Sequence, residues 1–388
     1  MKHRPTQNLA ALIGNGVSIA FNPDLNLREI GQEVIRRIRA ANSDGTAVEA
    51  LMQKIAARDQ TGDAREDFEV LVGSFAGHVE TFDQLSQLAE LLGAADHSTR
   101  EALILSANVA QGFYDTGLSH VLKVISERAV AEYDRKTDLT EFIRALVEDV
   151  PGPVTIGNLN YDTLLLAGLM EFPGAAFCDL ADGRFYAEIV APDGTRIPGQ
   201  PLRSRLDCPN RIKLYQLHGS LTFWRRPDGV IVKIAASDAR RADLYTAIRD
   251  DPSFQSRPVV VLANQRDKAD HVAKYPFSLA YEGFTAGLDE SDHWLIVGYS
   301  FRDECVNQKI REAFRRRNAV GSTPTVLLVT YGAELTTSAV TDAFGWDNDE
   351  DGSADWLTVN RDGANAMSAS ADWHRFIGGG SGLSAIAV

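Results

Sequence analysis

Cysteine is scarce in this 388-residue sequence, and its three copies, Cys178, Cys208 and Cys305, lie far apart. The paired CxxC motifs that hold structural zinc are absent from the sequence. The spacing therefore predicts neither a disulfide framework nor a zinc site. It also makes the reducing cytoplasm the expected location.

Long apolar runs and excess positive charge are lacking too. No run approaches the roughly 20 residues of a membrane-spanning helix, and residues 1–16 lack the run of about 7–15 apolar residues of a signal peptide. The chain has 39 Lys and Arg against 53 Asp and Glu, for a net charge of −14. Because sequence-independent nucleic-acid binding depends on neutralising phosphates, we expect no direct contact with nucleic acid or membrane.

Two hydrophobic patterns divide the chain. Residues 9–13 form a short apolar run before two glycines, which predicts a buried strand and a tight turn. From 27 to 150, apolar residues recur at helical spacing, so we expect helices whose apolar stripes face a core. Beyond that, strands alternate with helices. The apolar runs at 257–264, 293–301 and 323–332 predict parallel strands buried on both faces.

This pattern predicts an α/β fold: a Rossmann-like, doubly wound, mostly parallel sheet with a large all-helical insertion. Residues 1–26 would hold the first strand and a phosphate loop, and residues 27–150 the insertion. Residues 151–375 would complete the Rossmann-like domain, and the Gly/Ser-rich residues 376–388 would form a flexible tail.

Ligands of such sheets bind at the carboxyl ends of the strands, so polar residues that follow apolar runs are the candidate site. In the first such loop, Gly14 and Gly16 flank Asn15 and precede Ser18. Free N–H groups there would suit a pyrophosphate. Two glycines after a strand are equally typical of an ordinary turn.

A second loop brings Asn158, Asn160, Tyr161 and Asp162 to the end of a strand. Asn158 and Asp162 would either cap the following helix or form the wall of a ligand site. The residues alone leave both interpretations open.

A third loop places His218 and Gly219 after another apolar strand. This histidine would be either a core residue or a general base near neutral pH, and Gly219 would let a ligand approach closely. In a fourth loop, Gly298 and Ser300 end a very apolar strand, where an adenosine ribose would lie. Asn307 opens the next helix and would reach the same sugar.

The four loops, in this order, resemble those of the sirtuin family. GNGVS (14–18) is similar to the family's G-A-G-x-S phosphate loop, and NLNYD (158–162) to its T-Q-N-x-D loop. LHG (217–219) matches its catalytic H-G, and VGYSF (297–301) is similar to its G-T-S loop. The resemblance covers roughly residues 9–23 and 154–332.

The chain departs from ordinary sirtuins in three ways. It lacks a zinc module, and Leu159 stands where the family has Gln. The nicotinamide-loop motif is only echoed by NPDLNLR (22–28), which makes Asp24 a candidate for the carboxamide pocket. These departures resemble the zinc-less bacterial branch that hydrolyses NAD in anti-phage defence. The size is most similar to the sirtuin-like subunit that works with a HerA-type ATPase.

The resemblance implies NAD as substrate, no zinc, and hydrolysis to nicotinamide and ADP-ribose by an NAD glycohydrolase. His218 would be the general base, acting on a ribose hydroxyl or on water. Asn160 would hold the water and the ribose, and Asp162 would orient the loop or offset the growing positive charge. It also implies regulation by assembly, as a homo-oligomer or with the HerA-type ATPase. The expected NAD-binding residues are Gly14, Asn15, Gly16, Ser18, Asp24, Asn158, Tyr161, Gly219, Gly298, Ser300 and Asn307.

Three other functions remain open at this point. A protein deacylase would use the same NAD chemistry, although the missing zinc module argues against it. A nucleotide-sensing module would bind NAD or ADP-ribose without turnover, and a scaffold with remnant loops would bind no nucleotide.

Overall fold

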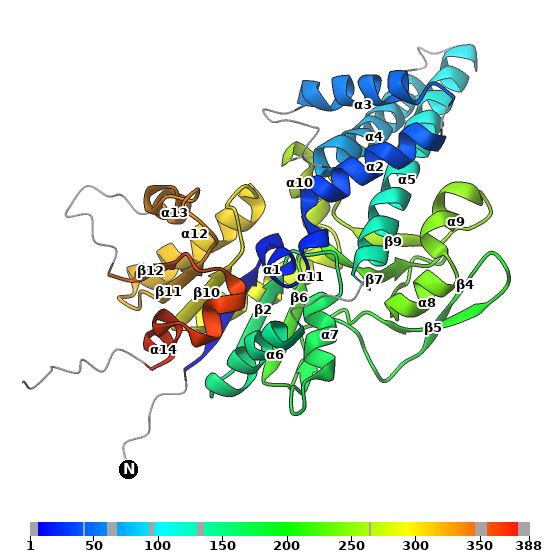
Figure 1. The fold of residues 1–388 in the computed structure, drawn as a ribbon. Helices are drawn as coiled ribbons and strands as arrows, with labels where there is room; N and C mark the ends of the chain where they lie inside the picture. The colour runs from blue at the N-terminus through cyan, green and yellow to red at the C-terminus, as the bar shows by residue number, and fades with distance from the viewer. Residues whose placement is uncertain are drawn as a thin grey trace, which may run out of the picture.

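A computed structural model of the chain describes residues 7–41, 43–59, 68–92, 97–129, 136–263, 265–345 and 355–378. Two sheets and a group of long helices make up these residues (Figure 1). The larger sheet has seven strands in the order β12-β11-β10-β1-β2-β6-β3, and all of its pairings are parallel. Its strands are β1 (Leu9–Ile13), β2 (Val154–Asn158), β3 (Phe177–Cys178), β6 (Ile212–Gln216), β10 (His293–Val297), β11 (Thr325–Val329) and β12 (Leu357–Asn360).

Helices cover both faces of this sheet, because its strands are apolar on both sides. In β1, Leu9, Ala11 and Ile13 join one core cluster, and Ala10 and Leu12 join another. The first face packs on α1 (Asn15–Phe21), α6 (Lys136–Arg144), α7 (Leu164–Glu171) and α14 (Ala371–Ile377). The second packs on α11 (Phe277–Glu290), α12 (Glu304–Ala319) and α13 (Thr337–Phe344). The predicted Rossmann-like, doubly wound sheet is confirmed.

The residues between α1 and β2 that the structure describes are helical, as predicted. The first sheet-covering helix leads through a 3₁₀ turn (Pro23–Leu25) into α2 (Leu27–Ala41), α3 (Gly45–Asp59), α4 (Phe68–Leu92) and α5 (His97–Arg128). After α6 the segment ends in a π-helical turn, Ala145–Asp149. Helices α2 to α5 pack together and extend away from the sheet (Figure 1). The apolar stripe of α2 is buried at Ile30, Val34 and Ile38, which confirms its predicted core-facing role.

A second sheet was not foreseen as a separate layer. It is antiparallel, with the order β4-β5-β8-β7-β9. Its strands are β4 (Ala187–Val190), β5 (Arg196–Pro201), β7 (Gly219–Arg225), β8 (Ile231–Ile234) and β9 (Arg257–Val260), and α8 (Ala236–Arg241) and α9 (Leu244–Asp250) lie beside it (Figure 1). The two Asp-Gly hairpins lie in this sheet. The prediction of a parallel strand at 257–264 is wrong, because β9 pairs antiparallel with β7.

The cysteine prediction also needs correction. Cys178 and Cys208 form a disulfide with an S–S distance of 2.05 Å, and Cys305 is free. The two cysteines are 30 positions apart, and the segment between them includes the β4–β5 hairpin. Sequence spacing alone carries no information on this approach.

Most of the predicted tail, residues 379–388, lies outside the described residues, and residues 376 and 377 belong to α14. Within the described ranges, no helix is both long enough and apolar enough to cross a membrane.

Candidate functional site at the carboxyl edge of the parallel sheet

The four predicted loops lie side by side because their strands are neighbours. Strands β10, β1, β2 and β6 are consecutive in the sheet, and parallel pairing aligns their carboxyl ends. Ile13 is in register with both Val297 and Asn158, and Asn158 is in register with Gln216. The loops at 14–18, 158–162, 217–219 and 297–301 therefore meet at one edge, as the sequence predicts.

Three glycines lock the first loop against the fourth. A Cβ at Gly14 would lie 2.5 Å from the Gly298 carbonyl oxygen, and one at Gly16 would lie 2.6 Å from the Gly298 Cα. Gly298 itself has a φ of +62°. The amide of Gly14 donates to Val297 and that of Gly16 to Gly298, both at 2.9 Å. The expectation of free N–H groups at these two positions is therefore wrong, since the glycines serve the packing of two backbones.

Asn158 and Asn160 join the second loop to its neighbours. Asn158 ends β2, and its side-chain amide donates to the Gln216 Oε1 at 2.8 Å. Asn160 donates from Nδ2 to the carbonyl of Gly14 at 3.1 Å. Asn158 therefore bridges two strands and does not cap the following helix.

Asp162 lies one residue before the N-cap of α7, Thr163, and its carboxylate contacts both the first residue of that helix and the first loop. Its Oδ1 accepts from the amide of Leu164 at 2.9 Å, and its Oδ2 accepts from the Ser18 hydroxyl at 2.6 Å. Burial raises the pKa of the Asp162 carboxyl, and the hydrogen bonds from Ser18 and Leu164 oppose that rise. Loops 144 residues apart in sequence are thus tied by one buried bond.

Tyr161 connects the second loop to the helical segment. Its hydroxyl lies 2.5 Å from Oε1 of Glu69 on α4 and 2.7 Å from the Val261 carbonyl oxygen. The side chain is only 5% exposed. Its hydroxyl is therefore engaged within the protein.

His218 faces this loop from the end of β6. The rings of His218 and Tyr161 lie 6.4 Å apart, and the backbone amide of Leu217 donates to the carbonyl of Asn158 at 2.8 Å. Gly219 has a φ of +84°, and a Cβ there would lie 2.1 Å from the Val259 carbonyl oxygen. Gly219 therefore permits the close approach of β9, whereas the sequence had led us to expect a ligand beside it.

A buried chain of ion pairs begins at the His218 ring. Nε2 lies 3.0 Å from Oδ2 of Asp303, which also lies 2.8 Å from the ammonium of Lys268. Lys268, on α10 (Gln265–Val272), lies 3.2 Å from Oε2 of Glu69. Tyr281 on α11 brings its hydroxyl to 3.4 Å from Nε2. This chain runs from the histidine at the sheet edge to α4.

The ion pairs of this chain favour the charged forms of Asp303 and Lys268. Burial alone would raise the pKa of the Asp303 carboxyl, but the hydrogen bond from His218 and the charge of Lys268 hold it well below its usual range. Burial alone would lower the pKa of the Lys268 ammonium, but Glu69 and Asp303 raise it. Removing one partner from such a buried pair leaves an uncompensated charge.

The other predicted residues have different surroundings. Asn307 accepts from the Tyr299 hydroxyl at 2.7 Å and donates to the Phe301 carbonyl at 2.8 Å, so both ends of its amide shape the fourth loop. Ser300 is exposed at the same edge. The amide of Asn15 donates to Leu25 at 3.2 Å, and Asp24 is exposed beyond it. No contact among the described residues joins the Asp24 carboxylate to the four loops.

Asp303, Lys268 and Glu69 were missed in the sequence. Asp303 carries a detectable signal, since it precedes the helical run of α12 and caps it by accepting from Val306 at 3.2 Å. Lys268 and Glu69 have no such signal. They lie on helices whose polar residues are mostly solvated, and only the tertiary fold buries them.

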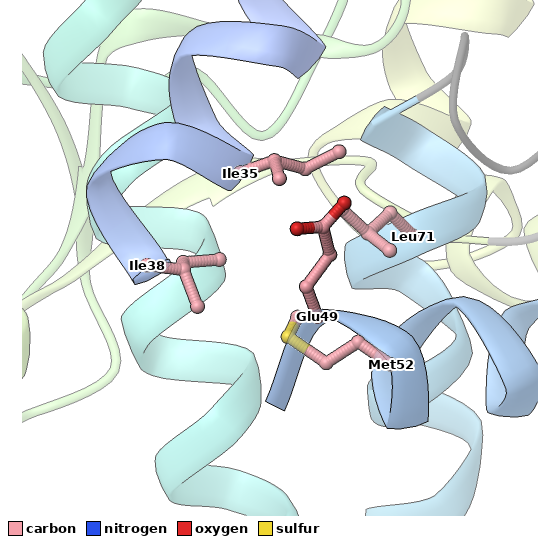
Figure 2. A pocket seen from close by; sticks show the side chains of 5 residues that line it. All are labelled: Ile35, Ile38, Glu49, Met52 and Leu71. Carbon is pink, nitrogen blue, oxygen red and sulfur yellow. The ribbon is translucent and has the colours of Figure 1, made fainter. Parts of the chain in front are cut away.

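Two hollows elsewhere contain none of the predicted residues. Figure 2 shows the first, between α2, α3 and α4, where the Glu49 side chain lies among Ile35, Ile38, Met52 and Leu71. It has no room for a water molecule, and the Glu49 carboxylate pairs with Arg39 at 3.1 Å. The second, of about 320 Å³, lies between α6 and α7. Among the described residues, no group of three or more His, Cys, Asp or Glu side chains is placed to hold a metal ion.

The site thus combines buried amides, a carboxylate and a histidine at the edge where a doubly wound sheet binds nucleotides. Residues 154–345, which contain three of the four loops, match the family model of the SIR2-like domain. No curated protein sequence matches the chain. Over residues 154–345 the chain is therefore similar to the SIR2-like domain, and this similarity suggests NAD-related activity.

Proposed function

We propose that the chain is an NAD glycohydrolase that converts NAD and water to nicotinamide and ADP-ribose. The observation that carries the proposal is the meeting of four sirtuin-like loops at one sheet edge, with His218 held by Asp303 at 3.0 Å. The SIR2-like match over residues 154–345 supports the choice of NAD as substrate.

The reaction needs no general acid, but it needs a general base. Nicotinamide leaves as a neutral molecule, because it is bound to ribose as a positively charged pyridinium. The barrier is the formation of an oxocarbenium-like sugar, to which water then adds. A base that removes a proton from that water, or from a ribose hydroxyl, completes the reaction.

The ring of His218 is oriented for such a role. An ionised carboxylate only accepts hydrogen bonds, so we infer from the 3.0 Å between Nε2 and Oδ2 of Asp303 that Nε2 carries the proton. Nδ1 then holds the lone pair of the neutral ring, and no described residue bonds to it. Asn160 would hold the water and the ribose, and Asp162 would fix the loop through Ser18.

NAD has to reach groups that are buried in this conformation. His218 is 4% exposed, Asn160 6% and Asp162 5%. Binding therefore requires a movement of the segments that cover them, and the proposal includes such an opening step.

Purified protein incubated with NAD, with and without an acetylated peptide, tests the proposal. We expect nicotinamide and ADP-ribose without peptide, and a loss of roughly 10²–10⁴-fold in rate for His218→Ala with an unchanged unfolding temperature. Acetyl transfer from the peptide would instead identify a deacylase, and binding without consumption a sensing module. Unchanged turnover by His218→Ala would refute the assignment of the base.

We further propose that the enzyme acts in the cytoplasm as an NAD-depleting effector in anti-phage defence, controlled by assembly with itself and with a HerA-type ATPase. The support is the sirtuin-like resemblance and a group of exposed apolar side chains, called here the apolar face, on two packed helices of the insertion. Its members are Leu85, Leu88 and Leu91 on α4 and Ile104, Leu105, Val109 and Phe113 on α5. Such a face is typical of an interaction site, and a second copy of the chain is the occupant that we propose.

Light scattering tests this assembly. We expect a mass above that of one chain, which Leu88→Glu with Leu105→Glu lowers and the exposed control Met170→Glu on α7 does not. An unchanged mass in the double variant would refute the face. Adding a HerA-type ATPase from the same organism to the NAD assay tests the second partner, and an unaltered rate with no co-purification would exclude it.

A further inference from the structure

The buried chain of charges around His218 includes a residue of the helical insertion. Glu69 on α4 lies 3.2 Å from Lys268, Lys268 lies 2.8 Å from Asp303, and Asp303 lies 3.0 Å from His218. The side chains of Lys268, His218 and Asp303 are 2%, 5% and 7% exposed, so water screens these interactions poorly. We propose that Asp303, Lys268 and Glu69 are positioning residues that fix the ring of His218 and set the charge around it, so that the insertion forms part of the catalytic machinery.

This inference rests on the proposed role of His218 as the base, and its first step is the orientation of the ring. Oδ1 of the Asp303 carboxylate accepts a hydrogen bond from the amide of Val306 at 3.2 Å, and Oδ2 makes ion-pair contacts with His218 and Lys268. The N-terminus of the 16-residue helix α12 adds a favourable field for a negative charge. A carboxylate fixed in this way selects the Nε2–H tautomer of His218 and leaves Nδ1 as the proton acceptor.

The second step is the charge balance. Glu69, Asp303 and Lys268 together carry a net charge of −1 while the ring is neutral, and the cluster becomes neutral when the ring takes a proton. A proton on the ring therefore leaves no net charge in this poorly screened site. Without Glu69, the same uptake would leave a net positive charge. This is the physical reason for a carboxylate from the insertion at this position.

The other groups around the ring do not change this balance. The phenols of Tyr281 and Tyr161 face the ring from α11 and from the second loop. Burial raises the pKa of the Tyr281 hydroxyl and of the Cys305 thiol, which lies near Asp303, so both stay neutral near neutral pH.

Isosteric variants of the full chain test the inference through the pH profile of NAD hydrolysis. Asp303→Asn keeps an oxygen that caps α12 but removes the charge. We expect its kcat to fall on the order of 10²-fold or more, with a smaller change in KM, and the acid limb of the profile to move to lower pH. Glu69→Gln should move the acid limb in the same direction by less, and Lys268→Gln should move it to higher pH.

Opposite shifts distinguish charge balance from general damage to the fold. The matched control is Asp179→Asn, which removes the charge of another aspartate paired with a lysine, Lys233; the Asp179 side chain is 8% exposed. Its acid limb should not move. If Lys268→Gln fails to fold, Asp303→Asn and Glu69→Gln still test the inference. Acid limbs that stay in place in both, or that move to higher pH, would overturn it.

A measurement without turnover separates this inference from the proposed function. Nitrogen-15 NMR of histidine-labelled protein reports the ring tautomer, and the signal of His218 is the one lost in His218→Gln. We expect the Nε2–H tautomer in the wild type and the Nδ1–H tautomer in Asp303→Asn, whose amide would donate to Nε2. A wild-type protein that leaves NAD intact would refute the proposed function alone, whereas a wild-type Nδ1–H tautomer would overturn the positioning role of Asp303.

Discussion

Replacing Gly298 by alanine tests the contact that holds the first and fourth loops together. Gly298 has a φ of +62°, and a Cβ there would lie 2.6 Å from both the Gly16 Cα and the Val17 backbone nitrogen. The left-handed conformation costs an alanine about 1–2 kcal/mol. Forcing a methyl group into packed backbone costs about 1–3 kcal/mol more. We therefore expect a loss of about 2–5 kcal/mol, from a total that is typically about 5–15 kcal/mol.

Gly321→Ala is the matched control, because it isolates the backbone contribution. Gly321 has a φ of +72°, and no heavy atom lies within 4 Å of the position that a methyl group would take there. Its loss should be about 1–2 kcal/mol. Urea denaturation followed by fluorescence measures both variants, and an unchanged slope shows that only stability has moved. If Gly298→Ala loses no more stability than Gly321→Ala, the two loops are not in backbone contact and the geometry described for this edge is wrong.

Two further variants examine buried polar groups. Burial, together with the positive charge of Arg249, lowers the pKa of His120 to about 4, below the value of about 6.5 in an unfolded chain. The fold is therefore more stable above about pH 6.5, where the ring is neutral, and this stability is lost as the pH falls toward 4. In the wild type the free energy of unfolding should fall by about 2 kcal/mol between about pH 7.5 and 5, and His120→Gln should abolish this fall. An equal pH dependence of the free energy of unfolding in both proteins would refute this. Ser18→Ala removes the 2.6 Å donor of the buried Asp162 and should cost about 1–3 kcal/mol in urea, whereas Ser253→Ala, which loses an exposed bond of equal length, should cost far less.

The loops of the site were predictable because each signal is local. A strand that is apolar on both faces identifies a parallel sheet, and parallel pairing places the residues after each strand at one edge. Ser18, Asp162 and His218 are found in this way. The sequence could not show which atoms they use, since the partners of Asp162 and His218 come from other loops.

The errors have physical causes of the same kind. A short apolar run such as 257–264 is buried in either type of sheet, so its composition does not give the direction of its neighbour. The separation of Cys178 and Cys208 along the chain says nothing about the 6.0 Å between their Cα atoms. Gly219 was assigned to a ligand because the nearby backbone of β9 is not visible in the sequence.

The ion-pair chain shows why the insertion and the sheet domain are coupled. Glu69 and Lys268 are 199 residues apart, and each lies on a helix whose local sequence gives no reason for burial. Lys268 stays charged in the interior only because Glu69 and Asp303 lie on either side of it. Detaching α4 would remove Glu69 and leave Lys268 with Asp303 alone, which weakens the attraction that Asp303 exerts on the His218 ring. Any movement that opens the buried site at α4 therefore also changes the charge that the histidine experiences.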